Sequence, residues 1–101
     1  MINVIYQEVD GHYTYLSVKG HAESDDYGKD LICASVSSIM FGLMNALDNH
    51  HEKIEIKELP NYIEIINNSN KELIDNYIEL VLIQLKTIEE SYGKFIKVER
   101  K

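Results

Sequence analysis

The sequence predicts an α+β protein of order ββαββαβ, with five strands in one sheet and two helices packed on one face. Three observations support this prediction. The dipeptide Asp10-Gly11 separates two stretches rich in β-branched and aromatic residues, apolar residues recur every three or four positions in two long segments, and apolar residues alternate in the remaining stretches. Two helices and a small sheet bury their apolar faces best as two layers. Residues 1–101 are expected to form one domain with one modest core.

The first half of the chain is expected to begin with a β-hairpin. Strands are predicted at residues 2–9 and 12–19, because Asp10-Gly11 suits a tight turn with positive φ. A helix is predicted from residues 31–33 to about Asn49, where six apolar residues share one face: Ile32, Val36, Ile39, Met40, Leu43 and Leu47.

The second half repeats this order of strands and helix. Strands are predicted at residues 53–59 and 61–67, and Ser69 with Glu72 predicts a capping box that opens a second helix. Gly93 is expected to end that helix in a left-handed conformation before a last strand at residues 94–99. The expected buried face of this helix is Leu73, Ile74, Tyr77, Ile78, Val81, Leu85 and Ile88.

Composition excludes several classes of protein. The formal net charge of −7 disfavours a nucleic-acid partner, since such proteins usually carry a basic patch. No unbroken apolar run of about 18 residues suggests a membrane span, and the N-terminus does not resemble a signal peptide. The chain has 1 cysteine, which cannot form an internal disulfide, so a reducing, cytoplasmic setting is expected. Exposed sheet edges favour a symmetric dimer.

Cys33 is the first candidate for chemistry. A lone cysteine in a small domain is more often a buried packing residue than a reactive thiol. However, the expected helix start places Cys33 in its first turn, where unpaired N–H groups and the helix dipole stabilise a thiolate. The same N–H groups are suited to binding an oxyanion.

His21 is the candidate base, although a histidine beside a glycine at a strand end is most often a surface turn residue. Gly20 allows close approach of backbone or substrate. A metal site built from His12, His50, His51 and Glu52 is the alternative use of the histidines. No ligand spacing typical of a metal site supports it, and no metal is expected.

The residues around both candidates resemble a known family. Gly20-His21-Ala22 is followed by the segment Gly28-Lys29-Asp30-Leu31-Ile32-Cys33-Ala34 and then by Ser37. This pattern is similar to that of Prp, the ribosomal-processing cysteine protease family of Firmicutes and related bacteria. The order of elements and the ending "LKTIEESYGKFIKV" are similar too, so the resemblance covers nearly the whole chain. Leu31, Ile32 and Ser35 are conservative departures from the pattern.

The resemblance implies a specific activity. Members remove a short N-terminal extension from a large-subunit ribosomal protein, cutting after a pair of aromatic residues and before a small one. By this resemblance Cys33 is the nucleophile and His21 the general base of a Cys/His dyad, in a homodimer without a cofactor.

Neighbouring residues have two interpretations each. Asp30 is expected to cap the helix, or else to orient the base. Ser37 lies one turn after Cys33 and either bonds into the site or makes an ordinary packing contact. Residues 23–29 are expected to form a polar lid over the substrate with Gly28 as a hinge. The resemblance implies that this loop orders when substrate binds. Gly20, Ala22 and Tyr27 are the other candidate substrate contacts.

Two other classes of function remain open from the sequence. One is a non-catalytic, dimeric α+β protein-binding module associated with ribosome assembly, in which Cys33 only packs. The other is a small-molecule sensor, which the absence of a glycine-rich phosphate loop disfavours for nucleotides.

Overall fold

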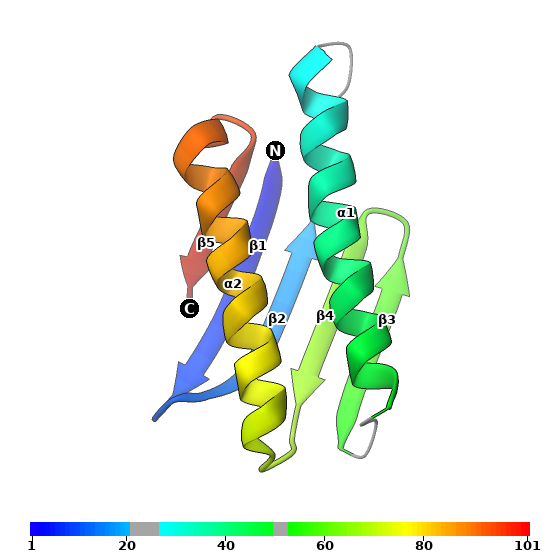
Figure 1. The fold of residues 1–101 in the computed structure, drawn as a ribbon, viewed down its shortest axis with the longest axis vertical. Coiled ribbons are helices and arrows are strands. Elements are labelled where there is room, and N and C mark those ends of the chain that lie inside the picture. The colour runs from blue at the N-terminus through cyan, green and yellow to red at the C-terminus, as the bar shows by residue number, and fades with distance from the viewer. Residues whose placement is uncertain (21–26, 50–52) are drawn as a thin grey trace.

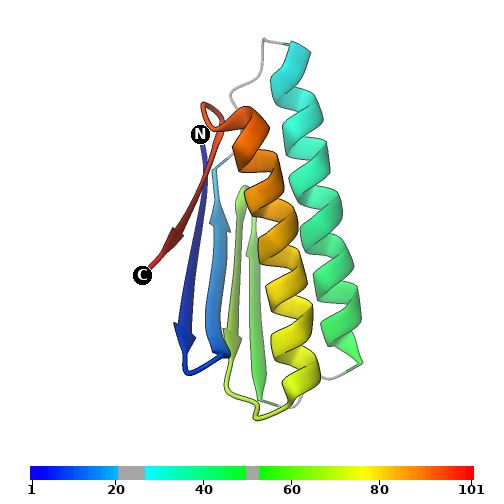
Figure 2. The same ribbon diagram turned by 60° about the vertical axis from the view of Figure 1, so that its left-hand side comes forward.

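The computed structural model of the chain describes residues 1–20, 27–49 and 53–101. It confirms the α+β class and the ββαββαβ order. Helices α1 (Tyr27–Asp48) and α2 (Glu72–Tyr92) cover the same face of one sheet (Figure 1, Figure 2). The strands of that sheet are β1 (Ile2–Val9), β2 (His12–Lys19), β3 (Ile54–Leu59), β4 (Tyr62–Asn67) and β5 (Ile96–Arg100).

The strand order β3-β4-β2-β1-β5 explains why both helices share one face. Only β1 and β5 pair in parallel, so β2 and β4 run in opposite directions. The crossover β2-α1-β3 moves toward one edge of the sheet, and β4-α2-β5 moves toward the other (Figure 1). Both crossovers are right-handed, as such connections almost always are. The strands of the second crossover run opposite to those of the first, and the second crossover also moves toward the opposite edge of the sheet. The two reversals cancel, so both helices lie on the same face.

The two hairpin turns follow from local sequence. Asp10 and Gly11 have φ of 52° and 79°, as the tight turn between β1 and β2 requires. Asn61 has a φ of 59° after Pro60, which is the pattern of a type II turn, and it joins β3 to β4.

The core lies between the helices and the central strands. It contains the α1 residues that were expected to be buried, although Ile39 is only half-buried. It also contains a buried face of α2 that includes Leu82, which was not among the residues expected there. Leu73 was expected in that stripe but is 44% exposed, so this prediction was wrong. The sheet contributes its helix-facing residues Ile2, Val4, Tyr6, Leu16, Val18, Ile65 and Ile96.

Both helix starts differ from their predictions. Helix α1 begins at Tyr27, so Tyr27 and Gly28 belong to its first turn and not to a loop. Its 22 residues span about 33 Å, whereas a strand of 8 residues spans about 27 Å. The first turn of α1 therefore projects beyond the sheet (Figure 1). The sequence of this turn, Tyr27-Gly28-Lys29-Asp30, contains no apolar repeat from which a helix could be predicted.

The expected caps of α2 were also wrong. Its N-cap is Lys71 without a side-chain hydrogen bond, while the Ser69 hydroxyl donates to Asn67 Oδ1 at 2.6 Å. Gly93 has a φ of −59° and is therefore not left-handed. The buried hydrogen bond to Asn67 occupies the Ser69 hydroxyl, so Ser69 does not cap α2.

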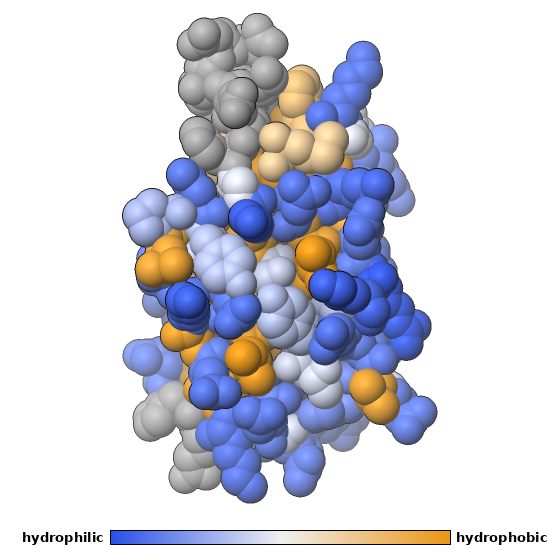
Figure 3. Space-filling model, turned by 180° about the vertical axis from the view of Figure 1, so that it is seen from behind, coloured by the Kyte–Doolittle hydropathy of each residue, from blue (hydrophilic) through white to orange (hydrophobic). Residues whose placement is uncertain are grey.

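Neither α1 nor α2 covers the outer face of the sheet (Figure 2). Seen from behind, the outer face is largely hydrophilic with separate hydrophobic patches (Figure 3).

Contrary to the expectation from the sequence, Leu31–Asp48 of α1 is long and apolar enough, by length and composition, to cross a membrane. The buried residues of this segment pack on the sheet and on α2, as the core helix of a two-layer domain does.

Candidate active site

A cavity of about 350 Å³ opens between α1 and the end of the sheet where β2 finishes. Pockets that bind small ligands begin at about this size. Its walls come from three places: Cys33, Val36, Ser37, Met40 and Phe41 of α1, Ile2, Val18 and Gly20 of the sheet, and Glu58, Leu59, Asn61, Tyr62 and Ile63 of the β3–β4 hairpin.

Cys33 lies on the α1 wall and is half-buried against the edge of the core. It is the seventh residue of α1, so the expectation that it lies in the first turn was wrong. Backbone N–H groups this far inside a helix donate to carbonyls of the preceding turn. The first-turn amides therefore cannot be assigned to a Cys33 thiolate or to an oxyanion.

Gly20 is fixed in the opposite wall by its backbone. Its φ is +90°, and its N–H donates to the Asn61 carbonyl at 2.8 Å. A Cβ at this position would lie 2.5 Å from the Met1 carbonyl oxygen, so only glycine fits without strain. His21 and Ala22 follow directly and lie outside the described residues.

The supporting residues have different outcomes. Ser37 lines the same cavity as Cys33, in agreement with the expected one-turn spacing. Asp30 is the fourth residue of α1, so it is not the N-cap that was expected. The roles of Tyr27 and Gly28 as substrate contacts are untested.

Sequence reading missed the wall formed by the β3–β4 hairpin. Leu59-Pro60-Asn61 indicated only a break between strands. Its position beside Cys33 depends on β4 pairing with β2, and on Gly20 bonding to Asn61. No local pattern in the sequence carries that information.

A carboxylate on β4 accepts hydrogen bonds from two phenols, one of which belongs to the cavity-lining Tyr62. The Tyr62 hydroxyl donates to Glu64 Oε2 at 2.5 Å, and the Tyr15 hydroxyl donates to the same oxygen at 3.0 Å. The bond from Tyr62, followed by that from Tyr15, lowers the pKa of Glu64. The same bond to Glu64 raises the pKa of Tyr62, so its phenol stays protonated at neutral pH.

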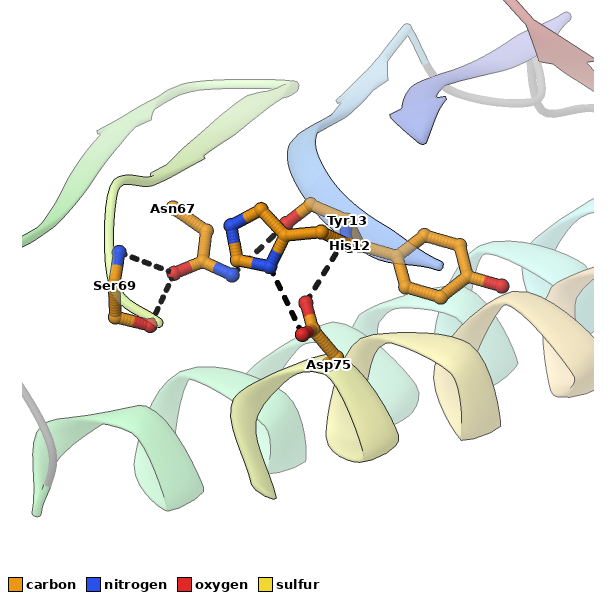
Figure 4. A network of polar contacts seen from close by, with 5 residues as sticks. All are labelled: His12, Tyr13, Asn67, Ser69 and Asp75. Atoms are coloured by element: carbon orange, nitrogen blue, oxygen red, sulfur yellow. Dashed lines mark hydrogen bonds and ion pairs between the residues drawn. The ribbon is translucent and has the colours of Figure 1, made fainter. Parts of the chain in front are cut away.

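The opposite end of the sheet holds a separate polar network (Figure 4). His12 Nδ1 lies 2.9 Å from Asp75 Oδ2, and the Tyr13 N–H donates to Asp75 Oδ1. Asn67 donates to the Tyr13 carbonyl and accepts from the Ser69 N–H and hydroxyl. This network ties the first hairpin and β4 to the start of α2.

The alternative metal site gains no support from this arrangement. His12 is engaged by Asp75, and His50, His51 and Glu52 lie outside the described residues. Within the described ranges, no three His, Cys, Asp or Glu side chains are grouped as ligands.

Comparison with known proteins gives concordant results. A family model described as "Cysteine protease Prp" matches residues 1–97. The ribosomal processing cysteine protease Prp of Staphylococcus aureus strain Mu50 is 31% identical over 99 residues, which cover 91% of each chain. Two crystal structures of the S. aureus enzyme, with a covalently linked product peptide and with a substrate peptide, align over 100% of both chains. Their TM-score is 0.88 in each case, at 30% and 28% identity.

Proposed function

This chain belongs to the cysteine protease Prp family, and we propose that it removes an N-terminal extension from a large-subunit ribosomal protein. Cys33 is the nucleophile and His21 the general base. The observation that carries the proposal is that Cys33 and Gly20 line one cavity. His21 follows Gly20 directly in the sequence.

The proposed reaction requires the Cys33 thiol and the His21 imidazole to come within reach of each other. His21 accepts the Cys33 proton, and Sγ attacks the carbonyl carbon of the scissile bond. The imidazolium then gives this proton to the departing amine, leaving an acyl-enzyme thioester. Water attacks the thioester, with His21 as base. This step releases the N-terminal part of the substrate with a free carboxyl group and restores the Cys33 thiol. The S. aureus relative has been solved with a covalently linked product peptide, which supports a covalent step in the proposed reaction.

Substrate preference is expected to come from the apolar walls. Val36, Met40, Phe41 and Leu59 surround the cavity, and Phe41 and Leu59 are 48% and 49% exposed. Side chains of this kind suit the aromatic pair expected before the scissile bond. Ser37 is proposed to position the thiol or the base from within the same cavity, and Asp30 to orient His21.

The remaining proposals concern assembly and setting. The enzyme is proposed to act as a cytoplasmic homodimer, without a metal or another cofactor and without nucleic-acid or membrane partners. An uncovered sheet face and an exposed edge strand support a dimer. Sedimentation equilibrium is expected to give twice the chain mass of 11.7 kDa, and a monomer at micromolar concentration would contradict this.

The function is tested by cleavage of a peptide that carries an aromatic pair followed by Ala or Ser. Wild type is expected to cut after the pair. Cys33→Ala and His21→Ala are each expected to lose at least about 10³-fold in kcat/KM, and the double variant little more, because a dyad acts as a unit. Binding without cleavage by folded wild-type protein would instead support the non-catalytic module.

A further inference from the structure

Glu58 places a carboxylate in the wall of the Cys33 cavity. It lies on the edge strand β3, opposite Ile63 of β4, which lines the same cavity. Successive side chains of a strand alternate between faces, so Glu58 points to the helix side of the sheet, as Ile65 does two residues beyond Ile63. Lys57 and Glu55 point to the outer face.

No partner within the described residues neutralises this carboxylate. Glu58 is exposed, and no hydrogen bond or ion pair of the described part of the chain involves it. The other ionisable residues that line the cavity there are Cys33 and Tyr62, and neither is a cation at neutral pH. With a net charge of −7, the chain favours a cation in this position.

We propose that Glu58 is a specificity-determining residue that selects peptides with Lys or Arg near the scissile bond. The inference rests on the proposed protease function and adds the charge of the substrate to it. A compact cavity of 350 Å³ is only roughly 9 Å across, which is two or three residues of extended chain. The cation therefore lies within about three residues of the cleaved bond.

Charge-swap kinetics test this pairing directly. Peptides with the same aromatic pair carry Lys, Gln or Glu at one position, moved through three residues on either side of the cleavage point. Wild type is expected to prefer Lys over Gln about two- to fivefold in kcat/KM at one or two positions, as exposed ion pairs allow. Glu58→Gln is expected to remove this preference, and Glu58→Lys to reverse it in favour of Glu.

Glu55→Lys is the matched control, because it makes the same change on the same strand but on the outer face. It is expected to keep the wild-type preference. The preference of wild type is also expected to shrink in 0.5 M salt, which screens exposed charges beyond about 4 Å.

The outcomes separate this inference from the function on which it rests. If folded wild type cleaves none of the peptides, the protease proposal fails and this inference fails with it. If wild type cleaves them with no preference for Lys, or if Glu58→Gln keeps that preference, only the role of Glu58 is overturned.

Discussion

Gly20 directly follows β2 with a φ of +90°, and a Cβ on it would lie 2.5 Å from the Met1 carbonyl oxygen. This backbone also donates to the Asn61 carbonyl. The residue before the proposed base is thus held between the first strand and the β3–β4 turn. The backbone conformation of Gly20, which would cost any residue other than glycine free energy, therefore lies beside the proposed active site.

Gly20→Ala is expected to destabilise the protein by roughly 1–3 kcal/mol, because alanine adds both a clash and an unfavourable φ. It is also expected to lower kcat/KM more than the loss of folded protein explains. Chemical denaturation and peptide cleavage measure the two effects.

Gly42→Ala is the matched control for this substitution. Gly42 lies in α1 with nothing within 4 Å of an added Cβ. Alanine there is expected to stabilise the helix by about 0.5–1 kcal/mol and to leave cleavage unchanged. Equal stability of the two variants would show that Gly20 is not constrained.

Tyr62→Phe is expected to raise the pKa of Glu64 toward that of an ordinary carboxyl group, because the strongest of its two phenol bonds is lost. The folded-state pKa is lowered in wild type. The hydrogen bond from Tyr62 therefore stabilises the folded protein at pH values above the pKa of Glu64 in the unfolded chain. This stabilisation is lost as the pH falls through the lower pKa of Glu64 in the folded protein.

Carbon-13 NMR of the Glu64 carboxyl group, followed through a pH titration, measures this shift. The stability difference between wild type and Tyr62→Phe is expected to be largest near neutral pH and to shrink below about pH 4. Tyr92→Phe, an exposed tyrosine on α2, is the control. An unchanged Glu64 titration in Tyr62→Phe would show that the Tyr62 hydroxyl does not stabilise the Glu64 carboxylate.

Among the elements, the first hairpin is joined to β4 by the buried Asn67 amide and to α2 by the Asp75 carboxylate. Asn67 is 1% exposed and bonds to Tyr13 and Ser69, while Asp75 of α2 bonds to His12 and to the Tyr13 N–H (Figure 4). This network lies at the end of the sheet far from the Cys33 cavity. It is expected to serve stability and not chemistry.

Asn67→Ala is expected to destabilise the protein by about 1–3 kcal/mol, because it leaves buried polar groups without partners. The activity of the folded fraction is expected to stay at the wild-type value. Asn68→Ala changes the exposed neighbour and is expected to alter stability by less than about 0.5 kcal/mol. A comparable loss of stability in Asn67→Ala and Asn68→Ala would show that this network does not stabilise the fold.

Element by element, strands were easier to predict than helix ends. Asp10-Gly11 and alternating apolar residues predicted β1 and β2 with their bounds, because turn chemistry and strand period are local. The start of α1 and the caps of α2 could not be predicted. The apolar repeat begins only at Ile32, after the first turn of α1, and the Ser69 hydroxyl donates to Asn67, which only the folded chain brings into position.

At the scale of the whole molecule, the two-layer arrangement follows from antiparallel β2 and β4 with two right-handed crossovers. This topology brings Cys33 beside the β3–β4 turn, which is distant in sequence. The sequence supported Cys33 and Ser37 as one face of a helix but could not indicate Glu58 or Leu59. Long-range strand pairing, which no local pattern encodes, decides those neighbours.

The central claim is that Cys33 and His21 act as a pair. The rate of Cys33 alkylation by iodoacetamide, followed from pH 5 to 9 by mass spectrometry, tests it most directly. Wild type is expected to react at pH 6, where an ordinary thiol is almost wholly protonated, and His21→Ala to react at least about tenfold more slowly. His12→Ala is expected to match wild type. Equal rates in wild type and His21→Ala, or a thiol inert until unfolding, would contradict the account.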